Sequence, residues 1–485
     1  MKTCCYFYHN MTINYIQVNA SIPICKFECP SDANAVILET IKNQIYDLKS
    51  IPQCVEHIRF GNNFNQLIEK DVLPAELQSI EFGDSFNQKI EKDALSAGLQ
   101  SIKFGDSFNQ KLEKDVLPAG LQSIKFGFKF NQKIEKDVLP AGLQSIEFGD
   151  KFNQKIEKDV LSAGLQSIKF GFKFNQLIEK DILPAGLQSI EFGDRFNKLI
   201  EKNVLPAKLR SIKFRQYFNQ VIEKDILPAG LQSIVFGRNF NQKIEKDVLP
   251  AGLHSIIFGD SFDQKIEKNV LPTGLRSIKF RQHFNQAIEK NVLPAGLQSI
   301  VFGQYFNQPI KKDVLPRGLQ SIAFRSHFNQ PIKENVLPQE LRSINFGYYF
   351  NQPIEKNVLP QGLQFLYFHY SFDQRIEKYV LPTGLQVIQF GSKFTHSIEN
   401  IPETTKLIIW NPPSNMTRNY TIYRCSQSYL ENYINTKKNK IGQVYTQVIN
   451  NYKYYMTDVE IIKPDINKEK IKELIIQLKN ELEIS

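Results

Sequence analysis

The sequence predicts a repeat solenoid that is mainly β, with one long parallel sheet of about 17 short strands, loop and turn returns, and small α/β ends. A Phe recurs every 22 residues from Phe64 to Phe394, with no insertion. Each unit contains Leu-x-x-Ile-x-Phe, in which Ile and Phe are two residues apart and therefore share one face of a strand. A unit this short cannot bury enough apolar area to fold alone, so the units must stack.

The consensus unit accounts for most of its own positions. It reads Phe-Asn-Gln-x-Ile-Glu-Lys-Asp-Val-Leu-Pro-Ala-Gly-Leu-Gln-Ser-Ile-x-Phe-Gly-x-x. Pro-Ala-Gly predicts a type I turn with Pro second and Gly fourth, and Glu76 in place of that Gly indicates that no positive φ is needed. Two columns hold 32 of the 37 Phe residues and are predicted to be core, while the Asn column beginning at Asn65 is predicted to form a ladder to backbone amides. Glu-Lys-Asp is predicted to be a solvated turn with local ion pairs.

The chain divides into three predicted regions. Residues 51–410 form the solenoid, and residues 1–50 form an N-terminal cap with a short helix over 35–48. Residues 411–485 leave the 22-residue frame after Asn-Pro-Pro, which is typical of a boundary. This tail is predicted to contain a hairpin over 443–462 and then a helix, which either covers the end of the solenoid or docks a partner. Its apolar helical stripe consists of Ile471, Leu474, Ile475, Leu478 and Leu482.

Three units contain Phe-Asn-Gln-Pro-Ile, at 306–310, 328–332 and 350–354, followed by Leu-Pro-x-x-Leu-x-x-Ile-x-Phe. This pattern resembles the FNIP repeat, a 22-residue relative of leucine-rich repeats, of the amoebal or giant-virus type. The resemblance covers residues 51–410, although Lys, Leu, Val or Ala replaces the Pro in most copies. It implies a leucine-rich-repeat-like solenoid with a parallel sheet on one face, and it implies no catalytic residues.

Composition bounds the location and the chemistry. The mean hydropathy is −0.32, no apolar run approaches the length of a membrane helix, and the first ten residues contain no secretory core. Six cysteines without a CxxC pair indicate reduced thiols, so we expect a cytoplasmic protein, in the host cytoplasm if the chain is viral. Cys25 and Cys29 lack the second ligand pair of a zinc site, and no catalytic or phosphate-binding motif occurs. We therefore predict no enzyme activity, no cofactor and no metal.

The charge balance argues against a nucleic-acid partner. Net charge is +10, but residues 51–410 contain 45 Lys and Arg against 38 Asp and Glu. This small excess is spread over sixteen units, whereas phosphate binding needs a concentrated basic stripe. The prediction is a protein partner, with no nucleic acid and no membrane.

The variable strand position carries the functional signal. It is charged in its first seven copies, from Glu81 to Lys213, and uncharged in seven of the last eight. Tyr and His gather beside it in the later units, and aligned exposed apolar residues favour a binding surface, the alternative being drift on a tolerant face. The candidate partner-binding residues are Val235, Ile257, Val301, Tyr305, Tyr348, Tyr367 and Tyr370.

A basic motif, Leu-Arg-Ser-Ile-Lys-Phe-Arg, occurs twice, three units apart. It is a candidate for anion binding through guanidinium and ammonium groups. Duplication of a three-unit block is the alternative explanation, because Val235 also recurs 66 residues on as Val301. The candidate anion-binding residues are Arg210, Lys213, Arg215, Arg276, Lys279 and Arg281.

These observations predict a scaffold that binds a protein partner on the sheet face of the solenoid. The alternative is a structural or self-assembling repeat protein with no specific partner.

Overall fold

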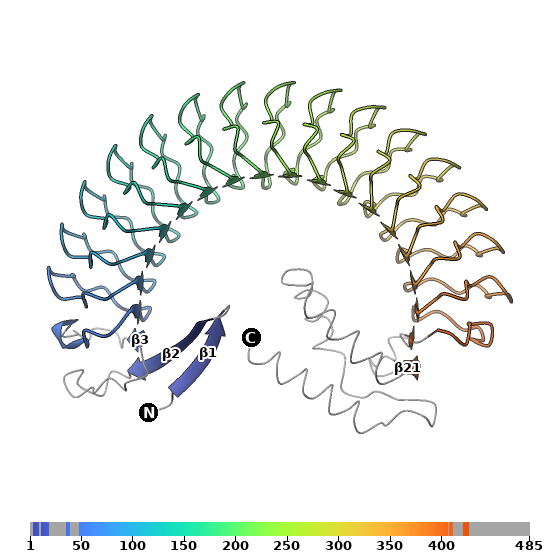
Figure 1. Ribbon diagram of the computed structural model, residues 1–485, viewed down its shortest axis with the longest axis horizontal. Coiled ribbons are helices and arrows are strands. Elements are labelled where there is room, and N and C mark those ends of the chain that lie inside the picture. The colour runs from blue at the N-terminus through green and yellow to red at the C-terminus, as the bar shows by residue number, and fades with distance from the viewer. Residues whose placement is uncertain are drawn as a thin grey trace. The chain divides into compact units, whose positions relative to one another are not determined.

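A computed structural model of the protein describes residues 3–8, 11–18, 35–38, 48–405, 407–410 and 421–425. The chain divides into two compact units, Met1–Gly259 and Asp260–Ser485. Within each unit, the strands follow one another along one side and the returns project to the other (Figure 1).

The first unit begins with an antiparallel hairpin of β1 (Thr3–Tyr8) and β2 (Met11–Val18). β3 (Ala35–Leu38) pairs in parallel with β2 and with β4 (His57–Phe60), and a 3-10 helix, Leu48–Ser50, precedes β4. The remaining strands are parallel to β4 and have three residues each. They are β5 (Ser79–Glu81), β6 (Ser101–Lys103), β7 (Ser123–Lys125), β8 (Ser145–Glu147), β9 (Ser167–Lys169), β10 (Ser189–Glu191), β11 (Ser211–Lys213), β12 (Ser233–Val235) and β13 (Ser255–Ile257).

The second unit continues the same pattern and ends in an antiparallel pair. Its parallel strands are β14 (Ser277–Lys279), β15 (Ser299–Val301), β16 (Ser321–Ala323), β17 (Ser343–Asn345), β18 (Phe365–Tyr367), β19 (Val387–Phe390) and β20 (Leu407–Trp410). β21 (Thr421–Cys425) then pairs antiparallel to β20. Seventeen described strands, β3 to β19, begin at 22-residue intervals, so the predicted parallel solenoid is confirmed.

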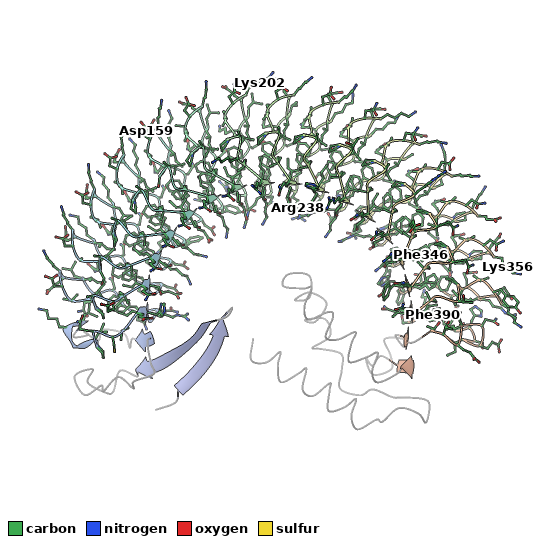
Figure 2. The ribbon with its side chains drawn as sticks, viewed as in Figure 1. Asp159, Lys202, Arg238, Phe346, Lys356 and Phe390 are labelled. Carbon is green, nitrogen blue, oxygen red and sulfur yellow. The ribbon has the colours of Figure 1, made fainter. Side chains whose placement is uncertain are left out.

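Register and core follow from the constant length of the repeat. Each paired residue in the repeat lies opposite the residue 22 positions away, as Ile80 does with Ile102. Ile80 and Phe82 are buried, and the ring of Phe82 lies 4.1 Å from that of Phe86 and 5.4 Å from that of Phe104. Each ring therefore packs against a ring of its own 22-residue repeat and against a ring of the next repeat. Phe346 and Phe390 lie between strand and return, whereas Asp159, Lys202 and Lys356 lie on the returns (Figure 2).

The turn before each strand differs from the prediction by one residue. The amide of Leu77 donates to the carbonyl of Pro74 at 3.2 Å, so Pro occupies the first position of the turn and not the second. No glycine in the described residues has a positive φ, as the substitution by Glu76 indicated. The glycines after the strands have another role: a Cβ on Gly83 would stand 1.9 Å from the carbonyl oxygen of Gly61. Successive backbones approach too closely there for an ordinary side chain.

Positive φ occurs instead at the third residue of Glu-Lys-Asp. Fourteen of the fifteen such residues are Asp or Asn, from Asp71 to Asn357, and these types adopt the left-handed region most readily after Gly. The exception is Tyr379, which is 70% exposed. The ion pairs here also join successive repeats, because Lys70 Nζ lies 3.3 Å from Asp93 of the next 22-residue repeat.

The predicted Asn ladder is confirmed. The amide of Asn87 donates to Asn65 Oδ1 at 2.9 Å, and that of Asn109 donates to Asn87 Oδ1 at 2.8 Å. The series recurs in the second unit and ends where the amide of Thr395 donates to Asp373 Oδ1 at 2.8 Å. Each Asn therefore fastens its return to the next one.

The ends differ in part from expectation. The helix predicted over 35–48 is wrong for Ala35–Leu38, which is β3. Its Val36 and Leu38 lie opposite Ile58 and Phe60, 22 residues on, so this β-branched segment extends the parallel ladder. Cys25, Cys29, the hairpin over 443–462 and the helical stripe over 471–482 lie outside the described residues. The boundaries at 50 and 410 remain predictions.

Candidate partner-binding face

We call the third residue of each three-residue strand, with the residue two positions after it, the sheet face. The strand residues alternate: in β15, Ser299 and Val301 are half-buried and Ile300 is fully buried. The second of these two positions is usually the close-packed Gly, and it is replaced in four repeats by Arg215, Arg281, Arg325 and His369. The sheet face therefore offers one variable side chain in most units and two in these four.

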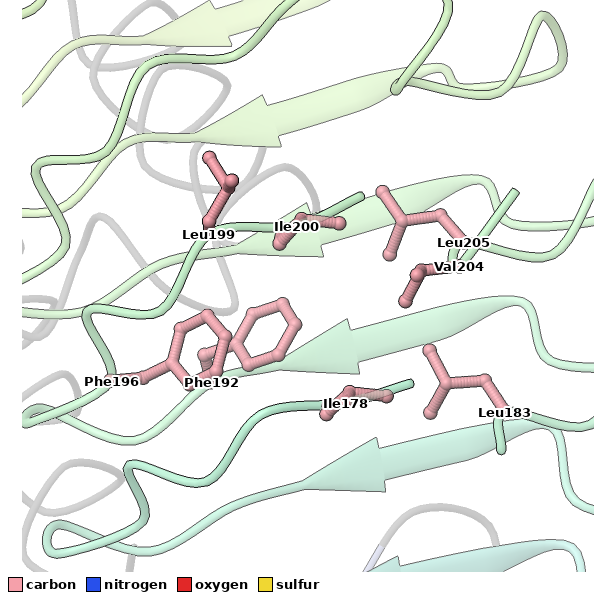
Figure 3. Close-up of a pocket in the computed structure, with 8 residues that line it drawn as sticks. All are labelled: Ile178, Leu183, Phe192, Phe196, Leu199, Ile200, Val204 and Leu205. Carbon is pink, nitrogen blue, oxygen red and sulfur yellow. The ribbon is translucent and has the colours of Figure 1, made fainter. Parts of the chain in front are cut away.

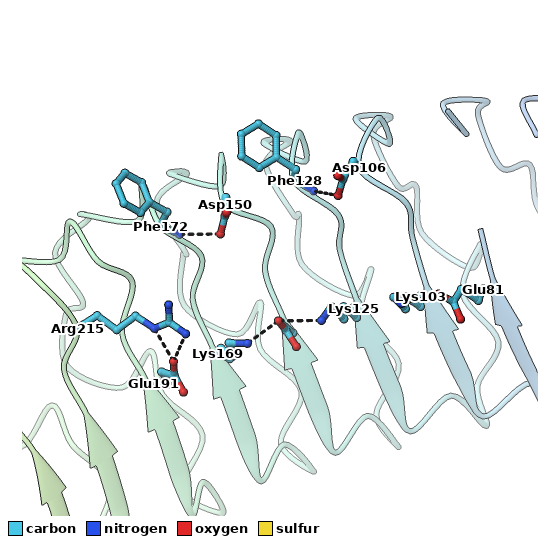
Figure 4. A network of polar contacts seen from close by, with 11 residues as sticks. Glu81, Lys103, Asp106, Lys125, Phe128, Asp150, Lys169, Phe172, Glu191 and Arg215 are labelled. Atoms are coloured by element: carbon cyan, nitrogen blue, oxygen red, sulfur yellow. Dashed lines mark hydrogen bonds and ion pairs between the residues drawn. The ribbon is translucent and has the colours of Figure 1, made fainter. Parts of the chain in front are cut away.

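In the first unit the charged side chains of the sheet face bind one another. Glu81 pairs with Lys103, and Glu147 pairs with both Lys125 at 3.1 Å and Lys169 at 2.7 Å (Figure 4). Burial alone would raise the pKa of Glu147, but hydrogen bonds from the two lysines outweigh it, so the pKa of this carboxyl lies below its usual value. Each of these side chains is therefore already paired with an opposite charge on a neighbouring strand.

The first copy of the basic motif is also neutralised. Lys213 lies 3.2 Å from Glu191, and Arg215 lies 2.5 Å from Glu191 and 3.3 Å from Asp194. Burial would lower the pKa of Arg215, but the hydrogen bonds and charge of Glu191 outweigh that effect and raise it. Arg210 is exposed on the turn before the strand. Two of the three candidate anion-binding residues here already hold carboxylates.

Two candidate apolar residues lie at the end of this unit. Val235 of β12 lies directly opposite Ile257 of β13, and Lys213 lies opposite Val235 on the other side. Both Val235 and Ile257 are half-buried and not fully exposed. They form a short apolar strip beside the neutralised charges.

The second unit presents a different row. Lys279, Val301 and Ala323 lie in register on β14, β15 and β16, and Asn345 and Tyr367 continue the row on β17 and β18. Val301 and Tyr367, both predicted from the sequence, are half-buried members of it. The row contains one charged residue in these five strands.

That charged residue has cations for neighbours. Among the described residues, no carboxylate lies within 4.0 Å of Lys279 Nζ. Burial lowers the pKa of Lys279, and the charges of Arg325 and Arg281 lower it further. Arg281 lies 3.9 Å from Asp260, a distance at the limit of an ion pair, and Arg276 is exposed on the turn before the strand. The second copy of the basic motif thus lacks the close carboxylates of the first.

The three remaining tyrosine candidates lie on the turns that follow the strands. There they belong to a run of rings, which we call the aromatic ladder: His283, Tyr305, His327, Tyr349, Tyr348 and Tyr370. The rings of His283 and Tyr305 are 5.1 Å apart and those of Tyr348 and Tyr370 are 4.7 Å apart. Lys393 Nζ lies 5.0 Å from the Tyr370 ring. Sequence reasoning identified half of these residues, and the shared 22-residue spacing of His283, Tyr305, His327 and Tyr349 is the signal for the rest.

Other surfaces offer less. The hollow in Figure 3 lies between successive returns of the first unit and is lined by apolar residues such as Ile178, Leu199 and Val204. It has no room for a water molecule, so it is a seam in the packing. Within the described part of the chain, no cluster of three His, Cys, Asp or Glu residues is placed to hold a metal, and no helix is long and apolar enough to cross a membrane.

Comparisons with known proteins agree with this architecture. The FNIP repeat model matches the chain in eight stretches: residues 43–85, 86–129, 130–173, 174–217, 218–261, 240–283, 284–327 and 328–371. Among solved structures, the chain is similar to CroV588, a giant-virus protein described as a novel circular LRR protein, with 41% identity and a TM-score of 0.74. The match covers 80% of this chain and 57% of that chain, so this chain spans little more than half the length of CroV588.

A weaker match is to the Drosophila Toll–Spatzle complex, with 12% identity and a TM-score of 0.49, covering 81% of this chain and 57% of that one. No curated protein matches. The FNIP model spans most of the solenoid, and the predicted resemblance is confirmed. This chain belongs to the FNIP-repeat family.

Proposed function

We propose that the chain is a protein-interaction scaffold whose partner binds the sheet face and the aromatic ladder of the second unit. One observation supports this most: Val301, Ala323 and Tyr367 form an uncharged row beside exposed tyrosines, whereas the charges of the first unit are paired with each other. Covering apolar area contributes ~25 cal/mol per Å², while exposed ion pairs contribute ~0–1 kcal/mol. Covering the sheet face of the second unit therefore contributes more to the free energy of binding than covering that of the first unit.

The exposed aromatic residues support the same surface. Tyr305, Tyr348 and Tyr349 are 40–48% exposed although each ring contacts a neighbour in the ladder. A tyrosine held by its neighbours loses little conformational entropy on binding, and tyrosine is enriched among the residues that dominate interface affinity. Val235 and Ile257 are proposed as a separate contact on the first unit. The proposal includes a cytoplasmic location, or the host cytoplasm for a viral protein, which composition and cysteine usage favour.

The test is capture of partners from cell lysate by the purified chain and by two double variants. Val301→Lys with Tyr367→Lys places charges in the uncharged row and should abolish specific capture without changing the circular dichroism spectrum. Lys125→Gln with Lys169→Gln is the matched control in the same column of the first unit and should leave capture within about twofold of wild type. Capture lost with the control pair and kept with the first pair would move the site to the first unit. Self-association with no captured partner, measured by sedimentation velocity, would favour the structural alternative.

A further inference from the structure

We propose that Lys279, Arg281 and Arg325 form a site for the carboxylates of an acidic segment of a protein partner. This inference rests on the proposed function and specifies the chemistry of the partner. Its basis is a cluster of cations on the sheet face, next to apolar residues, for which the described residues offer only one carboxylate, Asp260, 3.9 Å from Arg281.

The backbone positions of Arg281 and Arg325 lie on either side of one gap. Arg281 and Arg325 occupy the second position of the sheet face in two repeats with one repeat between them. Their backbones are therefore about 10 Å apart. Gly303 occupies the same position between them and has no side chain to fill the space. A Cβ at Gly303 would stand 3.0 Å from the Gln282 carbonyl oxygen, so the backbone itself closes the bottom of this gap. Lys279 lies two residues before Arg281, on the same face of β14.

Among the described residues, the charge of this cluster is only weakly compensated. Lys279 and Arg325 have no carboxylate within 4.0 Å among the described residues, and the one carboxylate near Arg281 is at 3.9 Å. Lys279 is half-buried, so water compensates its charge less well than that of an exposed lysine. The lowered pKa of Lys279 reflects this burial and then the repulsion from the two arginines. An incoming anion relieves that repulsion and gains charge-assisted hydrogen bonds.

The surroundings favour a protein segment over a nucleic acid. The row beside the cations is apolar at Val301 and Ala323, which suits a chain with carboxylates and apolar side chains in alternation. No further cation continues the row through Asn345 and Tyr367, whereas a nucleic acid needs a basic track along its backbone. Tyr305 lies between His283 and His327, so both of its neighbours in the ladder compete with a nucleobase for its faces.

The chain contains its own control. Arg215 occupies the same place in the first copy of the motif but is bound to Glu191 and Asp194. Gly is the usual residue at this position, so Arg→Gly restores the common repeat in either copy. Arg281→Gly with Arg325→Gly removes weakly compensated charge, and Arg215→Gly removes charge that two closer carboxylates compensate.

The experiment measures fluorescence anisotropy of a labelled peptide of alternating Glu and Leu with the full-length purified chain. The peptide should bind wild type. The double variant Arg281→Gly with Arg325→Gly should bind it roughly tenfold or more weakly than wild type, and so should the triple variant that also carries Lys279→Gln. Arg215→Gly should change binding less than about twofold. A peptide with Gln in place of Glu should not bind, and the circular dichroism spectra of the variants should match that of wild type.

Two outcomes would overturn the inference. Equal binding of the Glu peptide by wild type and the double variant would remove the carboxylate site. Tighter binding of an oligouridylate of equal charge, lost in the same variant, would assign the cluster to nucleic acid. Either result leaves the proposed function to be judged by the separate Val301→Lys with Tyr367→Lys capture experiment.

Discussion

The first and second units use nearly the same backbone to present opposite kinds of surface. Residues 51–259 contain 28 Lys and Arg against 26 Asp and Glu, and residues 260–405 contain 16 against 12, so the excess of positive charge is two and four. This difference is small. What differs is placement: each lysine in this column of the first unit lies beside Glu81, Glu147 or Glu191, whereas Lys279 is followed by Val301. The chemistry of a repeat surface therefore depends on the order of residues along a column more than on total charge.

This freedom exists because the fold is determined elsewhere in the repeat. The Phe pairs, the Asn ladder and the close-packed glycines hold each 22-residue repeat to the next in both compact units. The third strand residue takes part in none of these contacts, so it can change without loss of the core.

The largest effect is expected in the core, where the units should be equal. Phe214→Ala and Phe346→Ala each remove a ring that lies about 4 Å from one Phe and about 5 Å from another, and each should lower the free energy of unfolding by ~3–5 kcal/mol. Denaturant unfolding gives the values, and hydrogen exchange should show faster opening in adjacent repeats. A much smaller loss for Phe346→Ala would mean that the second unit is not packed like the first.

The next effect should differ between the units. A Cβ at Gly105 would stand 2.0 Å from the Gly83 carbonyl oxygen, whereas at Gly303 the nearest atom is 3.0 Å away. Gly105→Ala should therefore destabilise the chain by ~1–3 kcal/mol and Gly303→Ala by less, because the backbone must move farther at the first site. Thermal melts measure both, and equal losses would show that the gap between Arg281 and Arg325 is no more open than other glycine positions.

Smaller effects of opposite sign are expected on the sheet face. Glu147→Gln leaves Lys125 and Lys169 without their carboxylate and should cost up to ~1 kcal/mol, while Lys279→Gln removes repulsion and should stabilise by a similar amount. Because the pKa of Glu147 is lower in the folded state, its contribution is complete above about 4.5, the ordinary value, and is lost as pH falls through the folded pKa. Urea unfolding at pH 7 and pH 3 tests both statements, and a loss of stability in Lys279→Gln would contradict the account of the cation cluster.

The smallest effect should appear in the second unit on mild acidification. Burial lowers the pKa of His369, whose Nε2 lies 2.9 Å from Asn345 Oδ1. The unfolded chain then binds a proton more readily than the folded one, so stability should fall as pH drops from about 6.5 through the folded pKa. Hydrogen exchange in β17 and β18 at pH 7 and pH 5.5 measures this change. His369→Gly, which restores the usual residue, should remove it, and an unchanged pH dependence in that variant would assign the effect to another group.

The period of the sequence made the core predictable, because residues that recur every 22 positions must meet in a stack. Phe64, Ile80 and the Asn ladder followed from that rule alone. β3 was missed although Val36 and Leu38 stand 22 residues before Ile58 and Phe60, because that segment lacks the Phe and Asn of the consensus. The left-handed conformation at the Asp71 position could also have been predicted, since Asp or Asn stands there in fourteen of the fifteen repeats.

The candidate site was harder to predict, since a column shows which residues are neighbours and not whether they bind. Val301 and Tyr367 were identified as a row, but the sequence alone placed Lys213 and Lys279 in equal motifs. Their difference depends on side chains from other strands: Glu191 lies 3.2 Å from Lys213, whereas none of the carboxylates in the described residues lies within 4.0 Å of Lys279. The ring contacts that join Tyr305 and Tyr348 to the aromatic ladder likewise depend on the path of the turns.

The Asn ladder also has a mechanical consequence. Its bonds, like those between the strands, point along the direction in which repeats succeed one another, so tension in that direction loads them one repeat at a time. Such a stack resists compression through its packed rings and yields to extension by peeling. Each repeat that detaches releases 22 residues, or about 75 Å of extended chain. A solenoid of this kind therefore behaves under load as a series of equal, separately released lengths of tether.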